Sequence, residues 1–381
     1  MSVSSRSEVS LYVHIPFCSS RCGYCDFNTY TAQELSGGIQ QSSFHEVLIQ
    51  EVVLAAQTLN RPTVSTVFFG GGTPTMIGAP ALNNILEVIG REFSLSSNVE
   101  ITTEANPDSV DEQMFRELKS GGFTRISLGM QSVSPTVLRV LQRTHTPGAS
   151  ESAARMARKA GFEHVNMDLI YGTPGESNAD VRESVDAALA AGVNHVSAYS
   201  LIVEDGTPLA RQVRAGELSA PDEDVCADRY EIIDEMLTSA GLHWYEVSNW
   251  AIPGAECKHN QAYWRGADWW GIGPGAHSHQ AGTRWWNHKH PSTYARSLEE
   301  GSPRAGEEIL TADQMHAESV RLGLRTRQGV PFDLLSEAER IRCRDLAVQG
   351  VLDMTGVESG VARVSQAGRL VADLAIREIL G

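Results

Sequence analysis

The sequence lacks long hydrophobic runs, and it has fewer basic residues than acidic ones. No stretch approaches the roughly 20 apolar residues that a membrane-spanning helix needs, so no such helix is predicted. The 381 residues include 31 Lys and Arg and 47 Asp and Glu, which gives a formal net charge of −16. Because an acidic surface repels phosphate backbones, no general nucleic-acid binding is expected. The opening segment MSVSSRSEVS is polar and lacks the apolar core of a signal peptide, so we expect a cytoplasmic protein.

The sequence also lacks the cysteine spacing of a disulfide framework. Three of its six cysteines lie within eight residues, in the segment HIPFCSSRCGYCDF. In a cytosolic chain, clustering of this kind more often indicates a metal site than a disulfide. The isolated cysteines, which we interpret as structural, are Cys226, Cys257 and Cys343.

Residues 11–208 alternate short β-rich runs with amphipathic helical stretches. Strands are expected at residues 11–15, 66–69, 100–104, 125–129, 165–170 and 195–202, and helices at residues 44–59, 81–93, 110–120, 149–160 and 179–191. Six βα units in succession predict a parallel sheet, either doubly wound or curled into a barrel. Glycine-rich or polar segments follow nearly every strand, where parallel α/β folds bind their ligands, so we expect one shared site there.

The pattern changes after residue 220. A helix is expected at residues 222–240, and residues 244–286 are rich in Trp, Gly and His. Short helices are expected at residues 311–322, 332–338 and 338–349, then two strands at 350–354 and 361–364, and a last helix from residue 366. This order resembles a winged-helix domain, for which the acidic charge favours a packing or partner role over DNA binding. We therefore divide the chain into residues 1–220, 221–304 and 305–381.

The clustered cysteines are Cys18, Cys22 and Cys25, in C-x3-C-x2-C spacing directly after the first expected strand. Three thiolates on a short loop can hold three irons of a [4Fe–4S] cluster and leave the fourth iron open. Zinc is the alternative, but structural zinc takes four ligands, and strand alternation gives no reason to expect His14 to serve as the fourth. We therefore favour an iron–sulfur cluster.

The cysteine loop resembles that of the radical SAM superfamily, in which the open iron binds the amino and carboxylate groups of S-adenosylmethionine (SAM). This resemblance implies an α/β fold with a partial (β/α)6 barrel, followed here by a smaller α+β winged-helix-like C-terminal domain. It implies the [4Fe–4S] cluster and SAM as cofactors, with one electron passing to the sulfonium to release a 5′-deoxyadenosyl radical. Tyr24 matches a position that packs near the adenine.

The segments LYVHIPFC, FFGGGTPT, EANPD, RISLGMQS, LQRTH and NMDLIYGTPG resemble the oxygen-independent coproporphyrinogen III oxidase family across roughly the whole chain. From the residues alone, Asp168 is the most informative, because a carboxylate inside an apolar strand must be paired or functional. Without the pattern, the favoured interpretation of Glu104 is a helix-capping or solvated surface acid. The resemblance leaves open a second SAM, and it implies SAM contacts at Tyr12, Tyr24, Gly71, Gly72, Thr73, Glu104, Gln131, Arg143, Asp168 and Ile202.

Two features depart from the true oxidases of that family and resemble its HemW branch, whose members are haem chaperones. Phe27 stands where the oxidases have a further cysteine, and Cys18 is only seventeen residues from the start, whereas the oxidases have a longer N-terminal extension. The segment KHNQAYW matches the H-N-x-x-Y-W motif of that branch, which implies haem binding by His259, with His277 as a second candidate. Imidazole is a common haem ligand, although an aromatic cluster of this kind more often packs in a core.

The resemblance therefore implies a protein that binds haem and delivers it to haem-accepting proteins, with no catalytic residue assigned. The alternatives are an oxygen-independent coproporphyrinogen III oxidase and a radical SAM enzyme that acts on another substrate. Among partners, we expect haem and haem-accepting proteins and no nucleic acid. Peripheral membrane association and a homodimer stay open.

Overall fold

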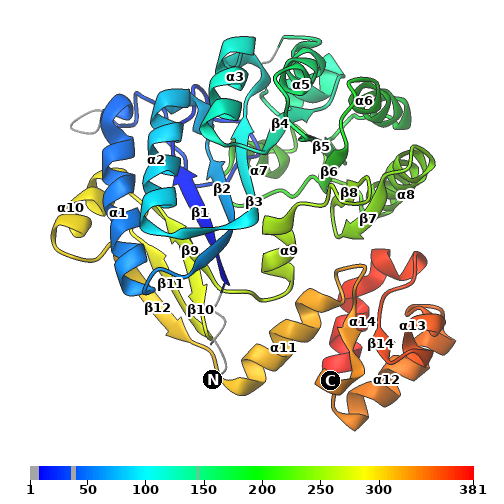
Figure 1. Ribbon diagram of the computed structural model, residues 1–381. Helices are drawn as coiled ribbons and strands as arrows, with labels where there is room; N and C mark the ends of the chain where they lie inside the picture. Colours follow the sequence, from blue (N-terminus) through cyan, green and yellow to red (C-terminus); the bar gives the residue numbers. More distant parts are fainter. Residues whose placement is uncertain (1–7, 36–39, 144–145) are drawn as a thin grey trace.

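The computed structural model describes residues 8–35, 40–143 and 146–381. Its core is a curved sheet whose six central strands are parallel neighbours in chain order (Figure 1). These strands are β1 (Glu8–Ile15), β2 (Thr63–Gly71), β3 (Ser94–Ala105), β4 (Arg125–Gln131), β5 (His164–Tyr171) and β6 (His195–Ser200). All six strands predicted from the sequence are confirmed. Because the edge strands of the sheet do not pair with each other, the barrel is partial.

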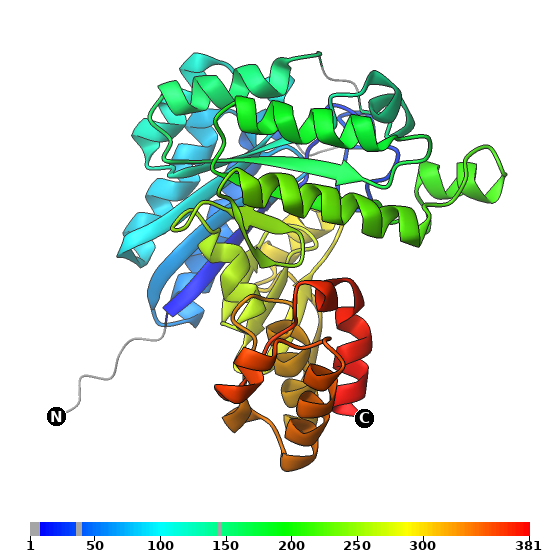
Figure 2. The ribbon, with the colours of Figure 1, turned by 90° about the vertical axis from the view of Figure 1, so that its right-hand side faces the viewer.

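Helices cover the outer face of these strands (Figures 1 and 2). They are α1 (Phe44–Thr58), α2 (Ala79–Glu92), α3 (Glu112–Gly121), α5 (Ala149–Lys159), α6 (Asn178–Ala190) and α8 (Glu223–Ser239). The short helices α4 (Pro135–Val140) and α7 (Pro208–Arg214) pack instead near the carboxyl ends of the strands, in a cluster with Ile170 and Leu201. Local sequence sets their ends: Ser177 and Asp180 form a capping box at the start of α6, and Gly122 ends α3 in the left-handed conformation. No helix of the described residues is long and apolar enough to cross a membrane.

The stretch rich in Trp, Gly and His extends the sheet at both edges, which the sequence did not predict. Strand β9 (Trp269–Ile272) pairs in parallel with β1, and β8 (Asn249–Ala251) pairs antiparallel with β6. The remaining elements are β7 (His243–Glu246), α9 (Lys258–Trp264), β10 (His277–Gln280), β11 (Thr283–Asn287), α10 (Pro291–Glu299) and β12 (Arg304–Ile309). The sheet thus runs across the predicted boundaries near residues 220 and 304, and that division of the chain stays a prediction.

The C-terminal region corrects two details of the predicted wing. Its elements are α11 (Ala312–Gly323), β13 (Val330–Pro331), α12 (Glu337–Val348), α13 (Met354–Glu358), β14 (Val361–Ala362) and α14 (Ala372–Leu380). Strand β14 pairs with β13, so the first predicted strand, at residues 350–354, is wrong: Asp353 caps α13, and only a single bridge joins Leu352 to Val364. The helix predicted at residues 332–338 is only a 3-10 turn over Phe332–Leu334.

Candidate functional site

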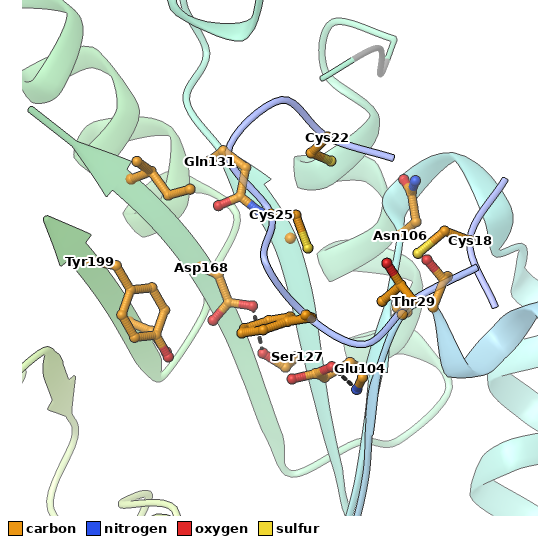
Figure 3. A pocket seen from close by; sticks show the side chains of 18 of the residues that line it. Cys18, Cys22, Cys25, Thr29, Glu104, Asn106, Ser127, Gln131, Asp168 and Tyr199 are labelled. Carbon is orange, nitrogen blue, oxygen red and sulfur yellow. Dashed lines mark hydrogen bonds between the residues drawn. The ribbon is translucent and has the colours of Figure 1, made fainter. Parts of the chain in front are cut away.

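A cavity of about 890 Å³ runs into the barrel from the carboxyl ends of the parallel strands. Its walls include the three clustered cysteines and all ten residues expected to contact SAM. Figure 3 shows Cys18, Cys22 and Cys25 on one side of this space and Glu104 and Asp168 below them. The structure therefore brings together residues that are far apart in the sequence. The last two residues of the LQRTH segment, Thr144 and His145, lie outside the described residues.

The cysteine loop is fixed by its own backbone and by its neighbours. The N–H of Cys18 donates to the carbonyl of Tyr30 (3.0 Å), and the N–H of Gly23 donates to the carbonyl of Leu141 (3.0 Å). Both ring nitrogens of His14 already have partners, since Nε2 lies 2.9 Å from the carbonyl of Asn28 and Nδ1 lies 3.0 Å from the Tyr12 hydroxyl, so neither is free to bind a metal. Among the described residues no group of three or more His, Cys, Asp or Glu side chains, the three clustered cysteines included, is arranged closely enough to hold a metal ion.

The thiols lie in a setting that suits a cluster. Burial raises the pKa of the Cys18 thiol, and it raises the pKa of Cys25 to about 11. A bound metal centre would favour the thiolate forms. The Arg143 guanidinium lies 3.5 Å from the Sγ atom of Cys22, where it would offset thiolate charge. A Cβ atom on Gly72 would come within 2.9 Å of the Cys18 sulfur, so a bare glycine backbone is required beside the cluster ligand.

Two carboxylates share the cavity below the cysteines. Burial, together with the charge of Asp168, raises the pKa of Glu104 to about 8, although the N–H of Gly71 donates to its Oε2 atom (3.1 Å). Burial also raises the pKa of Asp168, against hydrogen bonds from Ser127 (3.0 Å) and Asn166 (2.7 Å). Both acids line the cavity, where the hydroxyl and ammonium groups of SAM would supply further donors. The side chains present therefore fit SAM.

The H-N-x-x-Y-W motif forms α9, near the start of β2 (Figure 1). His259 is 2% exposed, and both of its ring nitrogens are used: Nδ1 lies 2.8 Å from the Thr66 hydroxyl and Nε2 lies 3.0 Å from the Tyr263 hydroxyl. Its ring also stacks on Phe68 at a centroid distance of 5.1 Å. Burial lowers the pKa of His259 to about 3, so the imidazole is neutral. His259 lines the base of the same cavity as the cysteines.

The other haem candidate is not brought to the cavity. His277 lies on β10, is exposed, and stacks on Trp286 at a centroid distance of 5.9 Å. The structure does not place His277 in the cavity, because β10 belongs to the sheet extension beyond β9. Several other aromatic side chains of this stretch pack in the core, which is the usual role of an aromatic cluster. They include Trp250, Trp270 and Trp285.

Some cavity residues were not predicted from the sequence. Asn106 and Thr29 lie beside Cys18, and Tyr199 faces the cavity from β6 (Figure 3). Asn106 stands in the EANP segment at the end of a strand, where a polar residue signals a ligand site, so the strand-end rule could have found it. Arg125 and His195 begin their strands and reach the base of the cavity, and no local signal marks them.

Comparisons with known proteins agree with this geometry. The radical SAM superfamily model matches residues 12–188. The solved coproporphyrinogen III oxidase HemN of Escherichia coli, described as a radical SAM enzyme, superposes with a TM-score of 0.83 and 23% identity, covering 98% of this chain and 90% of that one. The likeness to HemN concerns the fold alone. The chain is thus a radical SAM protein by fold and by cysteine loop.

Closer relatives define the family within that superfamily. The chain is 52% identical over 372 residues to the heme chaperone HemW of Mycobacterium tuberculosis, covering 97% of this chain and 94% of the relative. It is 35% identical over 269 residues to the heme chaperone HemW of E. coli K12, covering 71% of this chain and 69% of the relative. The chain belongs to the HemW family.

Proposed function

We propose that this chain is a cytoplasmic haem chaperone that carries a [4Fe–4S] cluster and SAM, binds haem, and delivers it to haem-accepting proteins. The observation that carries the proposal is a single cavity lined by the three cysteines, the expected SAM contacts and His259. Relatives 52% and 37% identical to the chain are themselves named heme chaperones, which supports the same function here.

The residues of the cavity have separate roles in this proposal. Cys18, Cys22 and Cys25 hold the cluster, which when bound supplies one electron to the sulfonium of SAM. Gly71 and Gly72 let the end of β2 pack closely against the segment that carries the cysteines, because a side chain at either position would collide with its neighbours. Glu104 and Asp168 accept hydrogen bonds from the ligand's hydroxyl and ammonium groups.

The hydrogen bonds of His259 indicate which nitrogen would take the haem iron. Thr66 donates its hydroxyl proton to Ser10 (2.9 Å), so Nδ1 of His259 carries a proton and donates to Thr66. Nε2 then holds a free lone pair that accepts from the Tyr263 hydroxyl. We propose that haem binds at Nε2 once the Tyr263 hydroxyl moves aside, while the bond to Thr66 keeps the ring oriented.

Haem titration followed by the Soret band tests this assignment. We expect His259→Ala to weaken haem binding and to change the spectrum, and His277→Ala to behave like the wild type. Equal affinities and spectra for wild type and His259→Ala would remove His259 from the site. An anaerobic assay with SAM, reductant and coproporphyrinogen III distinguishes the oxidase: we expect no protoporphyrinogen IX, since Phe27 occupies the position of the additional oxidase cysteine.

A further inference from the structure

Thr29 has a buried hydroxyl that no protein group satisfies. Its side chain is 1% exposed, and its Oγ1 atom has no hydrogen-bond partner among the described residues. Leaving a buried hydroxyl unpaired costs about 1–3 kcal/mol, so such a group generally has a ligand or a function. Thr29 lines the cavity and lies beside Cys18 (Figure 3).

The backbone holds Thr29 in this place. Its N–H donates to the carbonyl of Phe27 (2.7 Å). The next residue, Tyr30, is held by two further bonds: its N–H donates to the carbonyl of Pro16 (2.7 Å), and its carbonyl accepts from the N–H of Cys18 (3.0 Å). The guanidinium of Arg21 also hydrogen-bonds the carbonyl of Thr29. The backbone of Thr29 is therefore fixed beside the cysteine loop, and its side chain is buried.

Another sulfur of the loop already has a donor: the Arg143 guanidinium lies 3.5 Å from the Sγ atom of Cys22. The Thr29 side chain is the group that lies beside the sulfur of Cys18 (Figure 3). A thiolate is the form that binds iron, and a donor beside it offsets its charge.

We propose that Thr29 is a positioning residue, whose hydroxyl donates a hydrogen bond to the cluster-bound Sγ atom of Cys18 and raises the reduction potential of the cluster. Reduction adds negative charge to the cluster and its sulfurs, so a donor at a sulfur stabilises the reduced form more than the oxidised form. The inference rests on the cluster proposed above.

The test uses the full-length chain, reconstituted anaerobically with iron and sulfide, and a redox titration followed by visible absorption and electron paramagnetic resonance. Thr29→Val keeps the size of the side chain but removes the donor, so we expect a lower reduction potential with unchanged iron content. Thr29→Ala removes the donor without the added methyl group and should shift the potential in the same direction. Thr29→Ser keeps the hydroxyl and should match the wild type, as should Thr58→Val, a control whose exposed hydroxyl caps its own helix (2.8 Å to the Leu54 carbonyl).

The outcomes separate the two claims. Wild-type protein that takes up no cluster overturns the cluster proposal and with it the role of Thr29. Equal reduction potentials in wild type, Thr29→Val and Thr29→Ala would overturn the role of Thr29 and leave the cluster proposal intact. If Thr29→Val and Thr29→Ala fail to keep a cluster that Thr29→Ser retains, the hydroxyl is needed to hold the cluster, which supports the proposal. Loss in all three variants contradicts it.

Discussion

The Nδ1 atom of His259 lies 2.8 Å from the Thr66 hydroxyl, and this contact ties the H-N-x-x-Y-W helix to the second strand of the barrel. Thr66 continues the connection to Ser10 on the first strand, 2.9 Å away. A residue that the sequence alone suggests as a haem ligand is therefore also part of the barrel's base. The proposed bond to haem would use the other nitrogen of the same ring, Nε2.

Tyr263→Phe should strengthen haem binding, because it removes the hydroxyl that competes for Nε2 of His259. A hydrogen bond of about 1 kcal/mol corresponds to roughly a fivefold gain in affinity. Soret titrations of wild type, Tyr263→Phe and the double variant Tyr263→Phe/His259→Ala measure this effect. The gain should vanish in the double variant; a gain that survives there would mean that Tyr263 acts on haem without His259.

Thr66→Val should destabilise the protein, because it leaves the buried Nδ1–H group of His259 without an acceptor. The expected loss in the free energy of unfolding is about 1–3 kcal/mol, measured by chemical denaturation. The matched control is Thr58→Val on the exposed end of α1, for which the change should stay within about 0.5 kcal/mol. A loss no larger than that of the control would show that the contact does not support the barrel.

Gly72→Ala should prevent assembly of the cluster, since a Cβ atom there would lie 2.4 Å from the carbonyl of Phe17 and 2.9 Å from the Cys18 sulfur. Gly90→Ala, on α2, is the control: its nearest neighbour would be 3.8 Å away, and alanine in a helix interior is favoured by about 0.5–1 kcal/mol. Iron content and absorption after reconstitution report the result. Equal iron in the two variants would show that the loop can shift without losing its ligands.

The fold and the cavity were largely predictable, and the residues at its base were not. Strands β1 to β6 and the cysteine loop follow from apolar runs with motifs at their ends, a pattern that local sequence encodes directly. The positions of His259 and His277 depend on strands β7 to β12, whose Trp- and Gly-rich sequence gives no clear period and whose pairing is set by tertiary contacts. The sequence therefore identifies His259 through its motif without giving its position, and it offers His277 as a second haem candidate although the sheet extension separates His277 from the cavity.

Glu51 should make the stability of the protein fall as the pH rises. This carboxyl is fully buried, and burial raises its pKa to about 7, although Tyr294, Gly273, Asn287 and Trp270 all donate to it. Between about pH 4.5 and pH 7 the folded protein keeps a proton on Glu51 that the unfolded chain has released, so a rising pH favours unfolding by at most about 3 kcal/mol.

Denaturation of wild type and Glu51→Gln across this pH window measures the contribution of Glu51. The decline in stability should be smaller in Glu51→Gln than in wild type, whereas Glu87→Gln, at an exposed position of α2, should keep the wild-type slope. Parallel pH profiles for wild type and Glu51→Gln would contradict the raised pKa.

The central claim is that this HemW-family chain carries haem rather than converting a porphyrin. The most direct measurement loads the reconstituted full-length chain with haem, mixes it with an apo-haemoprotein such as apomyoglobin, and follows the Soret band of the acceptor. The account predicts that haem moves to the acceptor and that His259→Ala loads and transfers less. Protein that binds no haem, or that turns coproporphyrinogen III into protoporphyrinogen IX with SAM and reductant while transferring none, would contradict it.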